Sequence, residues 1–327
     1  MPSPMLTRLE IENFRSFKQL TVDPLKRINL ICGKNNSGKT TLLEALFVLP
    51  RPNDGFKMVD MLEPFRVPSA NLRENEDWLF YGKDGSAVIK ITGWLGVTPF
   101  GIEYYQDDEK ARIRAESFSS EAAWRPWRMN RNTIRDPGVD RKTGVKVAIF
   151  STDFAHSDKA ARDFSRIILK RKKGQVIEWM SQVEPRLTAI ESLQIDNHPP
   201  RLYADVGLPE MIPVAYLGQG VGRLISIYAE IFAEDANVLL IDEIENGLHH
   251  SVMQTVWKGL AVAAREGGVQ IFATTHSWEC ILAANGSIPS DDDFQVIRLD
   301  RIGDTIKPTI MDRETITTAE GLGWEMR

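Results

Sequence analysis

A glycine-rich segment near the start of the chain has the residue types of an anion-binding loop. It reads Gly33-Lys34-Asn35-Asn36-Ser37-Gly38-Lys39-Thr40 and continues into Thr41. A glycine, four residues and then Gly-Lys-Ser/Thr, between a predicted strand and a predicted helix, is a phosphate-binding pattern. Glycines let backbone N–H groups curl around a phosphate, and the positive end of the following helix favours the anion. We expect Gly33 to Thr41 to line an ATP site, with Lys39 on the β- and γ-phosphates and the Thr40 hydroxyl on Mg²⁺. The alternative is an ordinary glycine-rich turn.

An apolar stretch in the second half of the chain ends in two carboxylates. Val238-Leu239-Leu240-Ile241 is followed directly by Asp242 and Glu243. A buried central strand would deliver both carboxylates to the C-terminal edge of a sheet, where ligands of α/β folds bind. We expect Asp242 to hold Mg²⁺ and Glu243 to orient or deprotonate the attacking water, since positioning and charge stabilisation dominate phosphoryl transfer. The alternative is an exposed acidic turn.

Two further segments, one that follows a predicted strand and one that precedes a predicted helix, have residues that could bind a phosphate. The apolar stretch Ile271-Phe272-Ala273 runs into Thr274-Thr275-His276-Ser277, and we expect His276 to sense the γ-phosphate through a hydrogen bond. The predicted catalytic residues are therefore Glu243, His276 and Lys39, although a structural histidine is the alternative. Gly218, Gln219 and Gly220 precede a predicted helix and would form a second backbone cradle for an anion, unless they simply cap that helix.

The hydrophobic pattern predicts the elements that must position these residues. Strands are expected near 5–12, 18–22, 27–32, 187–195, 211–217, 237–241 and 269–273, and helices near 40–48, 71–78, 221–233, 248–265 and from 278. Segments 87–93, 100–105 and 111–118 predict an inserted antiparallel β subdomain. Helical spacing of apolar residues over 157–183, interrupted at 172–174, predicts a helical lobe of two helices. Strands that alternate with helices indicate parallel βαβ units, so the predicted fold class is α/β.

The composition is that of a folded protein. Hydrophobic residues make up 43% and charged residues 26% of the 327 residues, which excludes a disordered or fibrous chain. We expect one domain over 1–327, with an N-terminal lobe of about 1–150, a helical insertion of about 155–200 and a C-terminal lobe of about 210–327. No stretch approaches about 18 consecutive apolar residues, so we expect a cytoplasmic protein without membrane contact. Two cysteines, Cys32 and Cys280, are too few for a disulfide framework.

The net charge of −5 hides one strongly basic segment. Residues 124–146 hold seven basic side chains against two acidic ones, and Trp124 and Trp127 alternate with Arg125 and Arg128. Arginine can pair with phosphates and tryptophan can stack on bases, so contact with DNA or RNA is one hypothesis for this basic loop. A plain exposed loop, or a surface for a protein partner, is the alternative.

Five segments together resemble those of a known family, in the same order along the chain. They are Phe14-Arg15-Ser16-Phe17, the phosphate loop from Gly33 to Thr40, Leu217 to Arg223, Asp242-Glu243-Ile244-Glu245-Asn246-Gly247-Leu248-His249, and Thr274 to Ser277. The chain resembles the ABC-type ATPases of the AAA15/AAA21-like kind, relatives of the OLD nucleases and of the RecF, SMC and Rad50 ATPases. The resemblance covers about 5–50 and 210–327, and the segment from Asp242 to His249 is its most specific part.

The resemblance implies a P-loop NTPase fold of the ABC-type ATPase head and an ATPase that dimerises around ATP. Gly218 to Arg223 would be the signature segment, although the Leu-Ser-Gly-Gly form is missing, and Glu245 to His249 would be the D-loop that crosses the dimer interface. His250 stands where many relatives have proline. In the family, Arg15 lies near the nucleotide; here a structural or solvated arginine is the alternative.

The resemblance also bears on partners. After Thr274 to Ser277 only about fifty residues follow, which is too short for the Toprim nuclease domain of some relatives, so we expect no nuclease activity. ATP-driven closure would act on nucleic acid or on a separate effector protein, and relatives of this size occur in bacterial antiphage systems. The competing hypothesis is a regulatory or structural module that binds ATP with little turnover.

Overall fold

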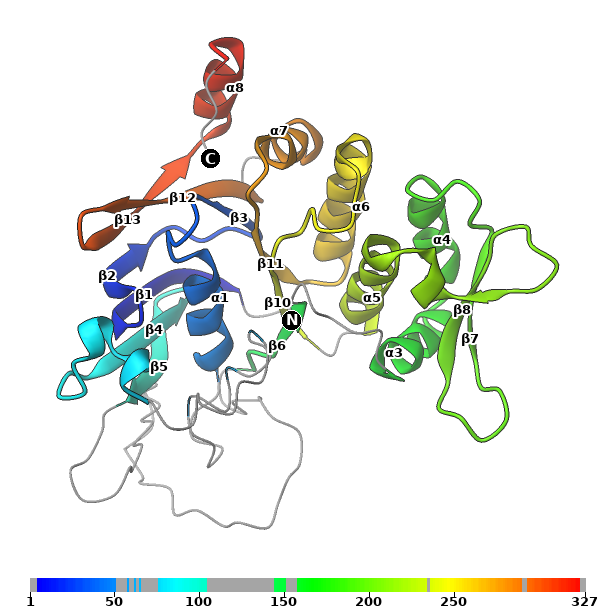
Figure 1. Cartoon of the computed structure of the whole chain (residues 1–327), viewed down its shortest axis with the longest axis horizontal. Coiled ribbons are helices and arrows are strands. Elements are labelled where there is room, and N and C mark those ends of the chain that lie inside the picture. The colour runs from blue at the N-terminus through cyan, green and yellow to red at the C-terminus, as the bar shows by residue number, and fades with distance from the viewer. Residues whose placement is uncertain are drawn as a thin grey trace.

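Three β-sheets and the helices around them make up the described part of the chain (Figure 1). The computed structural model describes residues 5–50, 58, 62, 65, 76–104, 144–150, 158–233, 236–289 and 293–323. Most of the basic loop, 124–143, and the expected strand at 111–118 lie outside the described residues.

The N-terminal sheet is antiparallel, with strand order β2-β1-β4-β5. Its strands are β1 (Leu6–Phe14), β2 (Phe17–Val22), β4 (Ile89–Leu95) and β5 (Thr98–Tyr104). Because β4 pairs with β1 from Leu6 to Glu12, the described strands near 87–105 extend this sheet and do not form a subdomain of their own. The inserted antiparallel subdomain was therefore a wrong prediction for these strands, because alternation along a strand does not reveal its partner.

The second sheet has six strands in the order β13-β12-β3-β11-β10-β6. They are β3 (Ile28–Cys32), β6 (Val147–Phe150), β10 (Val238–Ile241), β11 (Gln270–Thr274), β12 (Phe294–Ile302) and β13 (Thr305–Met311). All neighbours pair in parallel except β12 and β13. The predictions of β3, β10 and β11 are confirmed, whereas β6, β12 and β13 were missed.

Each face of the six-stranded sheet packs into its own hydrophobic core, which explains why its central strands are continuously apolar. In β10, Leu239 and Ile241 pack with α3 (Asp158–Leu169), α5 (Gln219–Ala233), α6 (Met253–Glu266) and α7 (Trp278–Ser287). The alternate residues Val238 and Leu240 pack with α1 (Lys39–Val48) and the N-terminal sheet. A last helix, α8 (Arg313–Gly321), follows β13.

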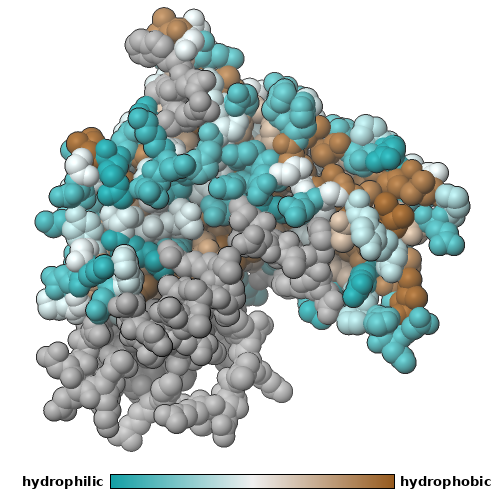
Figure 2. Space-filling view, in the orientation of Figure 1, coloured by the Kyte–Doolittle hydropathy of each residue, from teal (hydrophilic) through white to brown (hydrophobic). Residues whose placement is uncertain are grey.

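The helical lobe contains α3, α4 (Lys173–Ser181) and a small sheet of β7 (Ala189–Leu193), β8 (Arg201–Asp205) and β9 (Ile212–Pro213). The strand expected over 211–217 is wrong beyond Pro213, because the chain turns through a 3₁₀ helix, η5 (Val214–Leu217), into α5. Figure 2 shows hydrophobic side chains gathered over the lobe, at the right of that view.

Three further expectations concern a short helix, the cysteines and membrane spans. Within the expected helix at 71–78, the described part is the start of a 3₁₀ helix, η3 (Glu76–Leu79). Both cysteines are buried, and no disulfide joins them. Among the described residues, the helices are too short or too polar to cross a bilayer.

Candidate functional site

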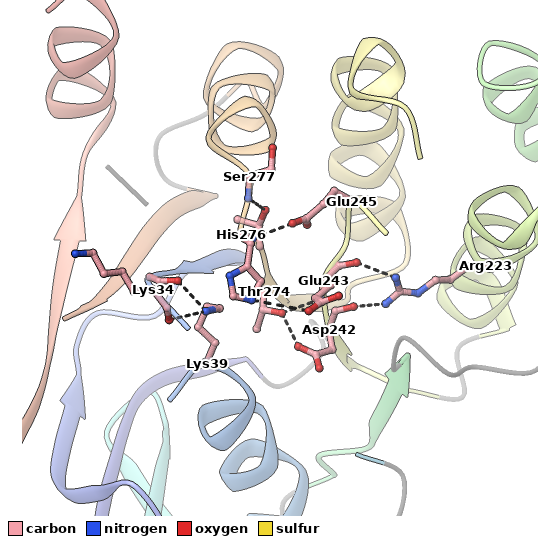
Figure 3. Close-up of polar contacts among 11 residues, drawn as sticks. Lys34, Lys39, Arg223, Asp242, Glu243, Glu245, Thr274, His276 and Ser277 are labelled. Atoms are coloured by element: carbon pink, nitrogen blue, oxygen red, sulfur yellow. Dashed lines mark hydrogen bonds and ion pairs between the residues drawn. The ribbon is translucent and has the colours of Figure 1, made fainter. Parts of the chain in front are cut away.

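The strand order brings the predicted site segments to one edge of the six-stranded sheet. β3, β11 and β10 are neighbours and run parallel, so their C-terminal ends lie side by side. Gly33 follows β3, Thr274 ends β11, and Asp242 follows β10. Segments separated by more than 200 residues therefore meet, as Figure 3 shows for Lys39, Thr274 and Asp242.

The phosphate loop is held in a conformation that needs its glycines. Gly33 has φ 141° and Gly38 has φ 94°, in the left-handed region that favours glycine. A Cβ at Gly33 would lie 2.5 Å from the carbonyl oxygen of Leu299, and one at Gly38 would lie 2.8 Å from the Phe17 ring. Arg301 donates to the carbonyl oxygen of Asn36 at 3.0 Å, so β12 also contacts the loop. The loop is therefore held between β12 and β2.

Helix α1 begins without a side-chain cap and has no acidic residue in its first turn. By contrast, α7 is capped by Ser277, whose hydroxyl accepts from the Cys280 N–H at 3.0 Å. Uncapped N–H groups at a helix start suit an anion. The buried Ser37 hydroxyl oxygen also has no hydrogen-bond partner among the described residues. Both observations fit a phosphate in this loop.

Lys39 is buried at the centre of the site, with 6% of its surface exposed. Its ammonium donates to the carbonyl oxygens of Gly33 at 2.8 Å and Lys34 at 3.1 Å, which leaves one of three donors. Burial lowers the pKa of Lys39, and the nearby acidic groups, which include Asp242 and Glu243, oppose that shift. A bound polyphosphate would supply further negative charge to this ammonium.

The hydroxyl of Thr274 joins the two predicted carboxylate residues (Figure 3). It donates to Asp242 Oδ1 at 2.6 Å and accepts the backbone N–H of Glu243 at 2.8 Å. Because a hydroxyl has one hydrogen, these two bonds fix its direction. Thr274 is fully buried, and its two bonds fix the position of Asp242, the predicted metal ligand, relative to Glu243, the predicted base. No role was predicted for it from the sequence, although its place at the end of β11 was a signal.

Glu243 has an unusual backbone and a partly exposed side chain. Its φ of 48° lies in the left-handed region, which costs a residue other than glycine about 1 kcal/mol or more. Its carboxylate lies 3.8 Å from His276 Nε2. The two predicted catalytic side chains are thus brought together at the mouth of the site, 42% and 38% exposed respectively.

Glu245 links the expected D-loop to the histidine segment. Its Oε1 accepts the backbone N–H of His276 at 2.8 Å, and its buried Oε2 has no hydrogen-bond partner among the described residues. From the sequence, Glu245 was expected to begin a segment that crosses an interface. The structure shows that its side chain supports the site of its own subunit.

The segment Gly218 to Arg223 lies on the other side of the carboxylates from Lys39, as Arg223 shows in Figure 3. Gly218 has φ 102°, and Gly218 and Gln219 are exposed at the start of α5. Gly220 is buried, and a Cβ there would lie 2.2 Å from the carbonyl oxygen of Gly247. No hydrogen bond among the described residues joins this segment to the phosphate loop, so its role as an anion cradle stays a prediction.

Arg15 contacts the helix that follows the phosphate loop. Its guanidinium Nε lies 2.8 Å from Oε2 of Glu44, a fully buried carboxylate on α1. The backbone N–H of Arg15 donates to the carbonyl oxygen of Leu79 at 2.7 Å. The ion pair with Glu44 on α1 fits the structural alternative for Arg15, and a place near the nucleotide stays untested.

Comparison with known proteins agrees with this geometry. The family model described as AAA ATPase domain, of the AAA15 kind, matches residues 5–124 and 150–281. The chain belongs to this family. The matched residues include the phosphate loop, Asp242, Glu243 and His276, so the AAA ATPase domain contains the whole predicted site.

Individual relatives are more distant. The chain is 23% identical over 321 residues to a Helicobacter pylori protein named ATP/GTP phosphatase, a match that covers 85% of this chain and 86% of that protein. A 33% identical match covers 36% of this chain but only 29% of the DNA replication and repair protein RecF of Thioalkalivibrio sulfidiphilus.

SMC heads are among the solved structures that resemble the chain. An SMC head bound to the C-winged helix domain of ScpA has a TM-score of 0.61 at 12% identity and covers 96% of this chain and 100% of that chain. The SMC head domain from Thermotoga maritima has a TM-score of 0.53 at 13% identity, with 94% and 99% covered. The AAA ATPase domain described here therefore has an SMC-head-like fold.

Proposed function

We propose that the chain binds ATP with Mg²⁺ and hydrolyses it to ADP and phosphate. The observation that carries this proposal is the convergence of Lys39, the Asp242–Glu243 pair and Thr274 at the ends of three neighbouring parallel strands, beside a glycine loop and an uncapped helix. Phosphoryl transfer is catalysed mainly by positioning and charge stabilisation, and these groups supply both.

The residues present fit a nucleotide–magnesium complex. Backbone N–H groups of the phosphate loop and the Lys39 ammonium would hold the phosphates, and Thr40 and Asp242 would hold Mg²⁺. The described residues contain no group of three or more His, Cys, Asp or Glu side chains that could bind a metal alone. This fits Mg²⁺, which binds in such sites through one or two protein ligands together with substrate phosphates and neutralises their charge.

In the reaction, Glu243 orients a water molecule and accepts its proton. The water oxygen bonds to the γ-phosphorus as the bond from that phosphorus to the β–γ bridging oxygen breaks, and ADP leaves with both bond electrons. Lys39 stabilises charge on the phosphates, and His276, 3.8 Å from Glu243, would hydrogen bond to the γ-phosphate. The exposure of Glu243 leaves its carboxylate accessible to water.

Phosphate release from purified protein tests the activity. Wild type should release phosphate from ATP, and EDTA should abolish the release. Glu243→Gln should bind ATP within about threefold of wild type but turn over at least about a hundredfold more slowly, because the amide cannot accept the proton. Glu266→Gln, a carboxylate paired with Lys172 on the surface, is the matched control and should match wild type.

The result for wild type separates the two candidate functions. Tight ATP binding without phosphate release would favour the regulatory or structural module with little turnover. GTP should be assayed in parallel, because the Helicobacter pylori relative is named ATP/GTP phosphatase. Failure of wild type to bind either nucleotide would refute the proposal as a whole.

We further propose that two copies close around ATP, with Gln219 and its neighbours from one copy facing the γ-phosphate of the other. The exposed start of α5, without an acidic residue in its first turn, supports this. Substituting Gly220 would be ambiguous, because it would break the contact with Gly247 inside one subunit. Gln219→Glu avoids this ambiguity. An acidic residue at a helix start does not destabilise the helix, but its charge would repel the γ-phosphate of the other copy.

Mixing variants tests this shared site. Lys39→Ala and Gln219→Glu homodimers should each be inactive, whereas a mixture should regain activity, because one site of the heterodimer carries neither substitution. Glu243→Gln should accumulate as an ATP-bound dimer in light scattering. A monomer at saturating ATP, together with no recovery on mixing, would refute the shared site. The effector or nucleic-acid partner of such closure stays a proposal.

A further inference from the structure

Arg223 is a buried cation that contacts backbone carbonyl groups at the site edge. It lies on α5 with 7% of its surface exposed. Its guanidinium donates to the carbonyl oxygen of Phe150 at 2.9 Å, to that of Glu243 at 2.9 Å and to that of Asp242. These acceptors follow or end two neighbouring strands, β6 and β10. The planar guanidinium has several donors in a fixed fork, so one side chain can serve three such carbonyls at once.

The same carbonyls belong to the residues that carry the predicted chemistry. Glu243 has its left-handed φ of 48°, and such a backbone persists only when its surroundings hold it. Thr274 accepts the N–H of Glu243 at 2.8 Å, and Arg223 donates to the carbonyl oxygen of Glu243 at 2.9 Å. Both peptide groups of Glu243 are therefore held, one from β11 and one from α5.

Three carboxylates of the site interact electrostatically with the Arg223 guanidinium. Burial lowers the pKa of Arg223, and the carboxylates of Asp242, Glu243 and Glu245 oppose the shift. Asp242 and Glu243 thus lie between two buried cations, Lys39 on one side and Arg223 on the other (Figure 3).

Arg223 also lies one helical turn from the exposed start of α5. Gln219 begins the helix, and Gly220 packs against Gly247 so closely that no Cβ fits between them. A displacement of the start of α5 would therefore move the Glu243 segment through two contacts, Gly220 with Gly247 and Arg223 with the three carbonyls.

We propose that Arg223 is a positioning residue that holds Glu243 in its reactive backbone conformation and couples it to the start of α5. This inference rests on the proposed ATPase activity. Its consequence is regulatory: a ligand or a second subunit that engages Gln219 sets the position of Glu243 in the same chain. Arg223 acts through Glu243 and does not itself touch the nucleotide.

Arg223→Lys tests the inference, because it keeps the charge but replaces the planar donor fork with a single ammonium group. We expect kcat to fall about tenfold to a hundredfold while ATP affinity stays within about threefold, since the phosphate loop is untouched. Arg313→Lys is the matched control: Arg313 also donates to backbone carbonyls, those of Asn285 and Ile288, but away from the site. Its kcat should stay within about twofold of wild type.

A double substitution separates positioning from a general loss of structure. Single-turnover rates should show that Arg223→Lys slows wild type but adds little to Glu243→Gln, because it acts through that carboxylate. A kcat of Arg223→Lys within twofold of wild type, or full additivity with Glu243→Gln, would overturn the inference. Loss of folding in both Arg223→Lys and Arg223→Gln would assign the arginine to core stability and also overturn it. If wild type shows no turnover, the proposed function fails instead.

Discussion

Replacing Thr274 by valine should damage both stability and turnover while keeping the shape of the side chain. The hydroxyl makes one bond to an ionised carboxylate, Asp242, and one from the N–H of Glu243. A bond to a charged group contributes about 1.5–3 kcal/mol and a neutral bond about 0.5–1.5 kcal/mol, so the loss of both lies at about 2–4.5 kcal/mol. We expect about 2 kcal/mol, because Asp242 is only partly buried and can bind water instead.

Urea unfolding followed by tryptophan fluorescence measures the stability term, and phosphate release measures turnover. Since the freed N–H no longer holds the strained Glu243, kcat should fall about tenfold to a hundredfold. Thr274→Ser retains the hydroxyl and should recover most of the rate. Thr275→Val is the matched control, because Thr275 is equally buried but its hydroxyl contacts the Ser277 N–H, at 3.1 Å, and the Cys280 side chain instead of Asp242 and Glu243. If Thr274→Val turns over as fast as Thr275→Val, the reasoning is refuted.

Three other predictions concern binding, titration and the basic loop. Lys39→Ala should weaken ATP binding at least about a hundredfold by calorimetry, because it removes the buried cation on the phosphates; unchanged affinity would reject the phosphate loop. Burial raises the pKa of the Cys280 thiol to about 12. Above about pH 9 this thiol therefore ionises in the unfolded chain but stays protonated in the folded one, so the free energy of unfolding should fall as the pH rises. The fall should be less steep in Cys280→Ala. Parallel pH profiles of the two would contradict this. Neutralising Arg125, Arg128 and Arg131 should lower the log–log salt dependence of DNA or RNA binding by about one unit for each arginine–phosphate ion pair removed; a wild type that binds neither at low salt ends that hypothesis.

The sequence by itself determined the local parts of the site. The phosphate loop, the Asp242–Glu243 pair and the segment ending in His276 were each predicted because their function depends on consecutive residues after an apolar strand. The buried strands β3, β10 and β11 followed from the same apolar runs. These signals lie within about ten residues, where the chain's own geometry sets the structure.

Tertiary structure decided which of these parts meet and what holds them. The order β3-β11-β10 placed Thr274 between the loop and the carboxylates, and the pairing of β4 with β1 replaced an expected subdomain with one sheet. Arg223 was assigned only to a signature-like segment, yet its donors reach carbonyls that lie 19, 20 and 73 residues away in sequence. Every residue has a backbone carbonyl, so no residue type marks these acceptors, and only the packing of α5 against β6 and β10 selects them.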